Sequence, residues 1–173
     1  MEKQERRILN ANEESPMRIL TLNAGSSSLK FSVIESTGEQ IIAQGNAEWA
    51  QMGTRYTFKA GSDTLVQSDM DWSDFDSAVR QVAADITERL EGECIDGVAH
   101  RVVHGGSRFT APVRITAKVE ALLRELTPLA PLHNPCGLEV VKSARTVFPH
   151  LLHIAVFDTA FHATLAPEAY TYA

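Results

Sequence analysis

The feature that most constrains the fold is a pair of segments near the start of the chain, residues 18–23 (RILTLN) and 29–35 (LKFSVIE). Apolar and polar residues alternate along both segments, which is typical of β-strands with one buried face. The turn between them, AGSSS, makes a hairpin. A second turn at residues 36–39 (STGE) leads into a third strand at residues 40–49 (QIIAQGNAEW). The sequence therefore predicts three consecutive antiparallel strands.

Further along the chain the apolar spacing changes from strand to helix periodicity. Residues 75–90 repeat apolar side chains at helical spacing, with Ser73 as the predicted N-terminal cap and Asp76 three residues beyond it. Asn134 followed by Pro135 predicts another helix start, with the asparagine side chain as the cap. The other predictions are a hairpin at residues 54–59 and 63–68, strands at 95–103 and 151–157, a helix at 117–126, and an end near Phe148 for the helix that Asn134 starts. This order predicts an α/β fold, a mixed β-sheet with packed helices.

Composition narrows the class of protein. The 173 residues are 44% hydrophobic and carry a formal net charge of -6 without a basic run, so no nucleic acid partner is expected. Cys94 and Cys136 lack the spacing of a disulfide framework or a zinc site. No segment resembles a signal peptide or a membrane span, so we expect a cytoplasmic protein with no membrane partner. Residues 1–16 are predicted to be a flexible extension before one domain that begins near Met17.

The turn of the first hairpin is rich in hydroxyl groups and backbone donors. Gly25 permits close approach of the backbone, Asn23 lies on one face of the first strand, and Ser28 and Lys30 share a face of the second. Such a turn can bind a phosphate group or a hydrated Mg²⁺ ion, and Lys30 adds a positive charge. The alternative is an ordinary Gly/Ser turn with a solvated lysine. It is not a Walker A loop, because the G-x-x-x-x-G-K pattern is missing.

Charged residues within or at the end of two apolar strands are the other candidates for chemistry. Alternation puts Arg101 and Val103 on one face, where they can offer a guanidinium fork to a carboxylate and an apolar surface to its methyl group. Asp158 ends an apolar strand, where a carboxylate is costly to bury unless it is paired or bound to a metal. The alternatives are a structural ion pair for Arg101, a turn cap for Asp158, and a surface or packing role for His133.

Four segments, in family order, resemble the acetate kinases. They are LTLNAGSSSLKFS at residues 20–32, AHRVVHGGSRFT at 99–110, LAPLHNP at 129–135 and VFDTAFHATLAPEAYTYA at 156–173. Propionate kinases are close relatives and remain compatible. The resemblance implies the ribonuclease H-like lobe of the sugar kinase, heat-shock chaperone and actin superfamily. It also implies reversible phosphoryl transfer from ATP to acetate, which gives acetyl phosphate and ADP.

The resemblance further implies roles for residues around the acetate. The matching positions would bind the carboxylate through Arg101 and the methyl group through Val103 and Leu132. His133 would assist transition-state binding, and Asp158 would act in catalysis. Because acetate is ionised at neutral pH and needs no strong general base, we expect Asp158 to orient Mg²⁺ or its water.

On the nucleotide side, the resemblance implies that Asn23 binds Mg²⁺ and that Lys30 contacts ATP. Ser26 and Ser28 would complete the phosphate cradle. The two other histidines inside the matching segments, His104 and His162, are expected to be structural or to support the residues that contact the ligands.

The chain differs from this family in length. Family members are more than twice as long and continue into a second domain, which in the family completes the site and supplies the homodimer interface. We therefore expect this chain, over residues 17–173, to be a truncated N-terminal lobe with negligible activity alone and with apolar sheet surface exposed. The open alternatives are a propionate kinase and a noncatalytic anion-binding module that retains the fold.

Overall fold

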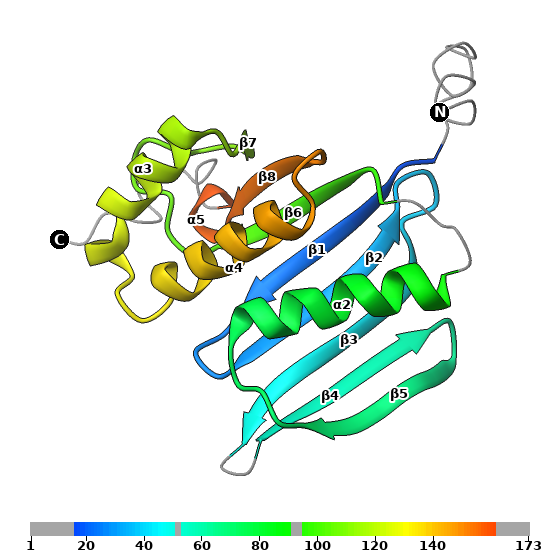
Figure 1. The fold of residues 1–173 in the computed structure, drawn as a ribbon. Coiled ribbons are helices and arrows are strands. Elements are labelled where there is room, and N and C mark those ends of the chain that lie inside the picture. The colour runs from blue at the N-terminus through cyan, green and yellow to red at the C-terminus, as the bar shows by residue number, and fades with distance from the viewer. Residues whose placement is uncertain (1–15, 51–52, 91–94, 162–173) are drawn as a thin grey trace, which may run out of the picture.

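A mixed sheet of eight strands forms the centre of the computed structural model, which describes residues 16–50, 53–90 and 95–161 (Figure 1). The strands are β1 (Arg18–Ala24), β2 (Ser28–Glu35), β3 (Gln40–Ala50), β4 (Gly53–Ala60), β5 (Asp63–Met70), β6 (Gly97–Val102), β7 (Val113–Arg114) and β8 (Leu152–Phe157). Their order across the sheet is β5-β4-β3-β2-β1-β6-β8-β7. β1, β6 and β8 run parallel, and the other neighbours pair antiparallel. The predicted fold class is confirmed.

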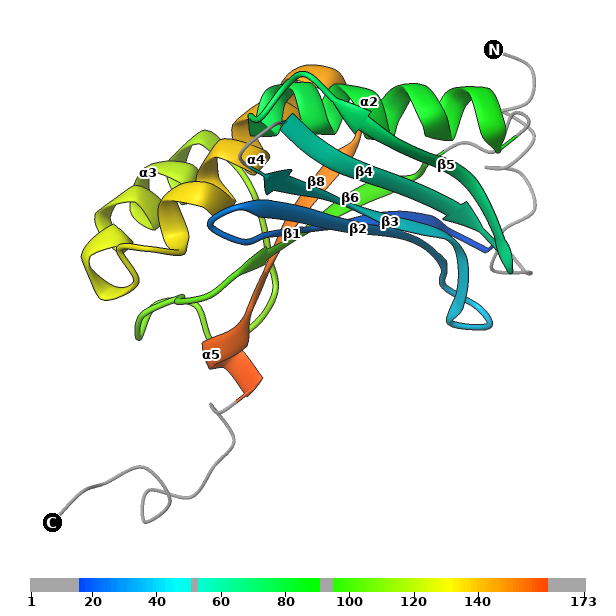
Figure 2. The same cartoon turned by 90° about the horizontal axis from the view of Figure 1, so that it is seen from below.

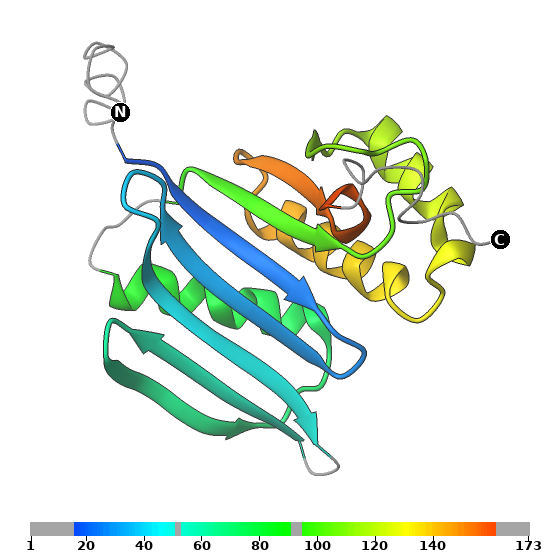
Figure 3. The same ribbon diagram turned by 180° about the vertical axis from the view of Figure 1, so that it is seen from behind.

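Two long helices, α2 (Phe75–Arg89) and α4 (Asn134–Val147), cover one face of the sheet (Figure 2). α3 (Ala117–Glu125) packs against α4 and leads into the 3₁₀ helix η1 (Thr127–Leu129). On the opposite face, the described part of the chain places only the short α5 (Asp158–Phe161), so the described elements leave most of that face uncovered, and we call it the open face (Figures 2 and 3). None of the helices described is long and apolar enough to cross a membrane.

The core lies between the sheet and the two long helices. Leu20, Leu22 and Phe31 point from β1 and β2 toward the helices, and each is at most 3% exposed. They pack in one cluster with Val79 and Val82 of α2, which are fully buried. The alternation that predicted the first two strands therefore has its physical cause here, because every second side chain enters this core.

The side chains that alternate along each strand with those of the core lie on the open face. Ile41, Leu152 and Val156 are between 42% and 46% exposed there, so the expected exposed apolar surface is present. The expected flexible extension at residues 1–16 falls outside the described residues except for Pro16. Cys94 and His162 also lie outside them.

Two predicted helix caps were wrong. α2 is capped by Asp74 rather than Ser73, because the Asp74 carboxylate directly precedes the first helical residue and accepts from the Ser77 amide at 2.8 Å. Asn134 does not cap α4 but is its first residue, and its side chain turns into the interior to bond the backbone of His104. The two-residue strand β7 was missed, because so short a segment has no period to detect.

Two buried histidines lie side by side on the neighbouring strands β6 and β8. The His100 and His153 rings stack with their centroids 5.3 Å apart, and His100 Nε2 lies 3.0 Å from His153 Nδ1. His153 Nε2 lies 3.0 Å from the Phe148 carbonyl oxygen, which can only accept, so His153 donates from Nε2. His153 Nδ1 then accepts from His100 Nε2. Burial, followed by the neighbouring His153, lowers the pKa of His100 to about 3, and burial also lowers the pKa of His153. Both imidazoles are therefore neutral in the folded protein at neutral pH.

We expect this pair to make folding stability fall as the pH drops below about 6.5. In the unfolded chain both imidazoles take up protons near that pH, whereas folded His100 does so only near 3. The unfolded state then binds more protons, and each group costs up to about 1.4 kcal/mol of stability per pH unit. Urea unfolding at pH 7.5, 6.5 and 5.5 measures the slope. The slope should be smaller in His100→Leu, and a slope equal to that of the unmodified chain would contradict the assignment.

Candidate functional site at the carboxyl ends of the parallel strands

Three polar side chains that are distant in the sequence meet where the parallel strands end. Arg101 in β6 donates from Nε to Asp158 Oδ1 at 2.9 Å and from Nη2 to Asp158 Oδ2 at 2.5 Å. Its Nη1 donates to Asn23 Oδ1 in β1 at 3.0 Å. Because β1, β6 and β8 run in the same direction, their carboxyl ends share one edge of the sheet. Parallel pairing therefore places the three groups together.

Lys30 joins this group from β2. It is the direct partner of Asn23 in the antiparallel pairing of β1 and β2, so both side chains project from the open face. Arg101 projects from the same face as Asn23. Thr21 in β1 pairs with Ala99 in β6, and Asn23 and Arg101 each lie two residues beyond these partners. The structure thus brings Asn23, Lys30, Arg101 and Asp158 to one corner of the open face, and among the described residues the only helix at this corner is the short α5, which begins at Asp158.

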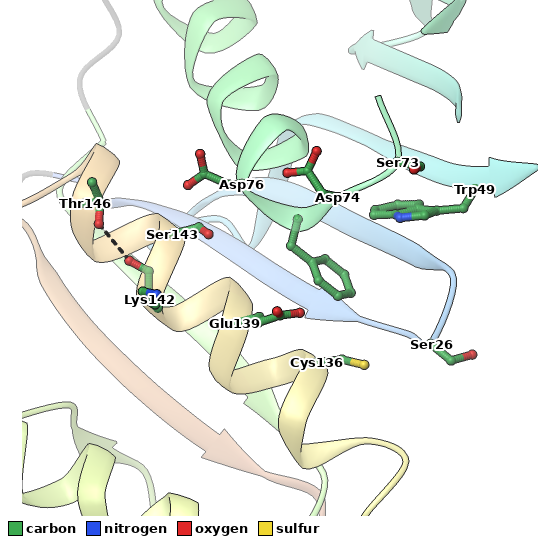
Figure 4. Close-up of a pocket in the computed structure, with 11 residues that line it drawn as sticks. Ser26, Trp49, Ser73, Asp74, Asp76, Cys136, Glu139, Lys142, Ser143 and Thr146 are labelled. Carbon is green, nitrogen blue, oxygen red and sulfur yellow. Dashed lines mark hydrogen bonds between the residues drawn. The ribbon is translucent and has the colours of Figure 1, made fainter. Parts of the chain in front are cut away.

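The hairpin turn places Ser26 and Ser28 differently. Ser28 closes the turn, since its carbonyl accepts from the Gly25 amide at 2.8 Å. A Cβ atom at Gly25 would lie 2.7 Å from Ser28 Oγ, so the glycine leaves room for that hydroxyl. Ser26 instead lies at the rim of a separate cavity of about 560 Å³, between the turn and the two long helices (Figure 4). No described contact joins Ser26 to Lys30 or Arg101.

The residues expected around the methyl group are less closely assembled. Val103 is half-buried and lies one residue past the end of β6, so strand alternation no longer determines its direction. Leu132 is 74% exposed, and His133 is an exposed residue at the start of α4 with no capping hydrogen bond from its side chain. Among the described contacts, none joins Leu132 or His133 to Arg101.

Two side chains hold the loop that follows β6, at His104 and Gly105. Asn134, which is 1% exposed, accepts from the His104 amide at 3.2 Å and donates to the His104 carbonyl at 3.1 Å. The Gly105 amide donates to Thr159 Oγ1 at 3.1 Å, one residue beyond Asp158. These bonds tie the segment after β6 to the start of α4 and to α5. The His104 side chain accepts from the Gly106 amide through Nδ1 at 2.9 Å, and its expected structural role stays a prediction.

The sequence analysis also missed Val156. It pairs directly with Arg101 across β6 and β8, lies on the open face and is 43% exposed. An apolar residue of this exposure beside a guanidinium group can contact the apolar part of a bound carboxylate. The signal was present in the sequence, since Val156 lies two residues before Asp158, but only the strand register pairs it with Arg101.

The electrostatics of the corner are those of an accessible ion pair. The Arg101 and Asp158 side chains are 43% and 41% exposed, so solvent screens their attraction and it contributes little to folding. Their arrangement is a two-point contact between the guanidinium fork and a carboxylate. In chemical terms, the corner shows that Arg101 is placed and oriented to hold a carboxylate.

A divalent metal is compatible with the same corner. Asn23 and Asp158 offer an amide and a carboxylate oxygen, the hard donors that Mg²⁺ prefers, and Mg²⁺ commonly takes one or two protein ligands while keeping water and phosphate oxygens. Among the described residues, no group of three or more His, Cys, Asp or Glu side chains could hold a metal ion. The fit is therefore to a metal shared with a phosphate ligand rather than to a metal enclosed by protein.

Comparison with known proteins adds an independent finding. A model of the acetokinase family matches residues 18–173. An acetate kinase from Leifsonia xyli subsp. xyli is 42% identical over 158 residues, covering 90% of this chain and 40% of the relative. An acetate kinase from Thermotoga maritima is 39% identical over 163 residues, covering 91% and 40%. The chain thus spans about 40% of the length of these curated relatives.

Solved structures give the same picture for the fold. A propionate kinase from Francisella tularensis superposes with a TM-score of 0.82 at 35% identity, covering 91% of this chain and 41% of that one. Porphyromonas gingivalis acetate kinase gives 0.78 at 34% identity with the same coverage.

Proposed function

The chain belongs to the acetokinase family, and on that premise we propose that residues 17–173 form the acetate- and phosphate-binding lobe of an ATP-dependent acetate kinase. The observation that supports this most directly is the convergence of Asn23, Arg101 and Asp158 at one strand edge. Each comes from a different segment of the chain, and the three meet only in the folded protein. The chain spans about 40% of the length of an acetate kinase relative, and the proposal assigns the remaining groups of the site to a second lobe.

In the proposed reaction, an oxygen of the acetate carboxylate attacks the γ-phosphorus of ATP. The bond between that phosphorus and the bridging oxygen breaks, and ADP leaves with the electron pair. Acetate has a pKa near that of glutamic acid, ~4.3, and is ionised at neutral pH, so no residue needs to remove a proton. The main obstacle is repulsion between the carboxylate and the phosphate oxygens. Positioning and charge neutralisation are therefore the tasks of the site.

The residues of the corner match these tasks. Arg101 binds the carboxylate through its fork, with Val156 and Val103 as apolar neighbours, and Lys30 binds phosphate oxygens together with the hairpin turn. Asn23 and Asp158 are the residues that would hold Mg²⁺. When bound, that ion supplies positive charge against the phosphate oxygens. His133 lies at the start of α4, and its proposed part in transition-state binding rests on membership of the family.

The fork of Arg101 is occupied by Asp158 in the structure. A substrate carboxylate needs the same edge, so Asp158 and acetate compete for it. If Asp158 and Asn23 held a metal ion with these oxygens, they would no longer accept from Arg101, and its fork would be free for acetate. The contacts of Arg101 therefore link metal binding by Asp158 to carboxylate binding by Arg101.

Replacing Asp158 with asparagine tests this link. We expect Mg²⁺-dependent phosphoryl transfer to fall by at least about 100-fold, because a charged ligand is lost, while acetate binding stays equal or becomes tighter. Acetate titration followed by NMR, and transfer rates measured at several Mg²⁺ concentrations, separate the two effects. If acetate binding fell more than the metal-dependent rate, the metal-orienting role would be wrong.

The experiment for the function itself uses the chain as it is and a second lobe. Acetyl phosphate, trapped as the hydroxamate, is measured with the chain alone and after adding the part of an acetate kinase relative that lies beyond the 40% matched here. We expect negligible product from the chain alone and restored product from the mixture. Acetate and phosphate binding without product in a well-formed complex would favour the noncatalytic module instead.

Propionate is the competing substrate, because the Francisella tularensis structure is that of a propionate kinase. One extra methylene changes binding in an apolar pocket by about 1 to 3 kcal/mol. The exposed apolar surface beside Arg101 accepts either methyl or ethyl. Parallel measurements of transfer to acetate and to propionate in the complemented enzyme decide between them.

A further inference from the structure

A second cavity, of about 400 Å³, lies at the beginning of β8, between β7 and the last turn of α4. Its lining includes Arg114, Arg145, Thr146 and His153. Since β8 runs from Leu152 to Phe157, this cavity and Asp158 lie at opposite ends of the strand, about 16 Å apart along it. The cavity is therefore separate from the corner that holds Arg101.

The charge around this cavity is positive in a chain whose formal net charge is -6. Arg145 donates to Glu120 Oε2 at 2.5 Å, and Arg124 donates to the other oxygen of the same carboxylate. One carboxylate thus serves two guanidinium groups. Arg114 adds a third, and no carboxylate among the described residues lies within ion-pair distance of it. Among the residues that line the cavity, Arg114 and Arg145 carry positive charge and none is a carboxylate, so the lining itself carries two positive charges.

The hydrogen-bonding capacity of the lining identifies the groups that remain available. His153 uses one ring nitrogen toward His100 and the other toward the Phe148 carbonyl, so it forms a neutral wall. The Thr146 hydroxyl donates to the Lys142 carbonyl at 3.0 Å. The free donors are therefore those of Arg114 and the part of Arg145 not engaged by Glu120. Two guanidinium groups bordering one cavity are suited to an anion with several oxygen acceptors.

We propose that this cavity binds the phosphate group of a small molecule, either free phosphate or a phosphate ester. A phosphate dianion matches the two positive charges of Arg114 and Arg145 and offers enough acceptors for both guanidinium groups. The volume lies in the range of small-molecule sites, so it leaves room for a short organic group beside the phosphate. This site does not depend on the proposed kinase function, because it shares no residue with the corner at Asp158.

Inorganic phosphate is the probe for the test, titrated into the ¹⁵N-labelled chain at low ionic strength. We expect saturable shifts of the amides near Arg114, Arg145 and His153. Arg114→Gln removes the charge that has no carboxylate partner among the described residues, at a position outside the core. It should raise the dissociation constant for phosphate by at least about tenfold. Arg114→Lys, which keeps the charge but loses the fork, should bind with intermediate strength.

Two control variants locate the effect. Arg55→Gln removes an exposed arginine of β4 and should leave binding unchanged. Arg101→Gln removes the guanidinium of the other site, and phosphate should still shift the amides around Arg114. The proposal is overturned if phosphate shifts only amides near Lys30 and Arg101, if the shifts do not saturate, or if Arg114→Gln binds phosphate as tightly as the unmodified chain.

Discussion

Replacing Arg101 with alanine is expected to abolish carboxylate binding at the edge where β1, β6 and β8 end. The side chain now makes three hydrogen bonds, two of them to the carboxylate of Asp158. A substrate carboxylate would take the same fork, and each charge-assisted bond lost costs about 1.5 to 3 kcal/mol. Acetate affinity should therefore fall by at least about 100-fold, and phosphoryl transfer with it. NMR titration with acetate measures the first effect and hydroxamate trapping in the complemented enzyme measures the second.

Two further variants make the result specific. Arg101→Lys keeps the positive charge and loses the two-point geometry, so it should recover only part of the affinity. Arg80→Ala removes an exposed arginine that pairs with Asp76 on α2, and it should leave acetate binding as it was. Unchanged acetate titrations in Arg101→Ala would remove this residue from the proposed site, whatever the effect on folding.

Replacing Gly45 with alanine is expected to give the largest loss of stability. A Cβ atom at this position in β3 would lie 2.0 Å from the backbone oxygen of Thr57 and 2.6 Å from Cζ of Phe31. The oxygen belongs to the neighbouring strand and cannot move without breaking the pairing of β3 with β4. We expect the free energy of unfolding to fall by about 3 kcal/mol, measured by urea denaturation. Thermal unfolding provides a second measurement.

Gly38 gives a matched control for this prediction. It lies in the turn before β3, and a Cβ atom there would meet nothing within 4 Å. Gly38→Ala should change stability by less than about 1 kcal/mol, with stabilisation as the expected direction because the unfolded chain loses freedom. Equal stabilities of the two variants would show that β3 and β4 can separate at Gly45 without cost.

Local patterns carried much of the fold prediction. The alternation in residues 18–35 and the helical spacing in residues 75–90 reflect burial against one core, so they identified these elements and their buried faces. Local patterns gave wrong predictions where a side chain bonds to a segment that is distant in the sequence. Asn134 had the sequence context of a helix cap, but its amide bonds the backbone of His104, 30 residues earlier in the chain. A cap and an interior bond need the same amide, and the sequence alone does not show which partner is near.

By itself, the sequence determined the family, the strand and helix segments, and the residue types suited to a carboxylate, a phosphate and a metal ion. Only the tertiary structure decided which of them meet. Arg101 lies 78 residues from Asn23 and 57 from Asp158, and its contacts with both follow from the order and direction of three strands. Alternation reports the two faces of a single strand, whereas neighbours and register are set by long-range packing. For that reason the pairing of Val156 with Arg101, the separate location of Ser26 and the positive cavity at Arg114 could be found only in the folded chain.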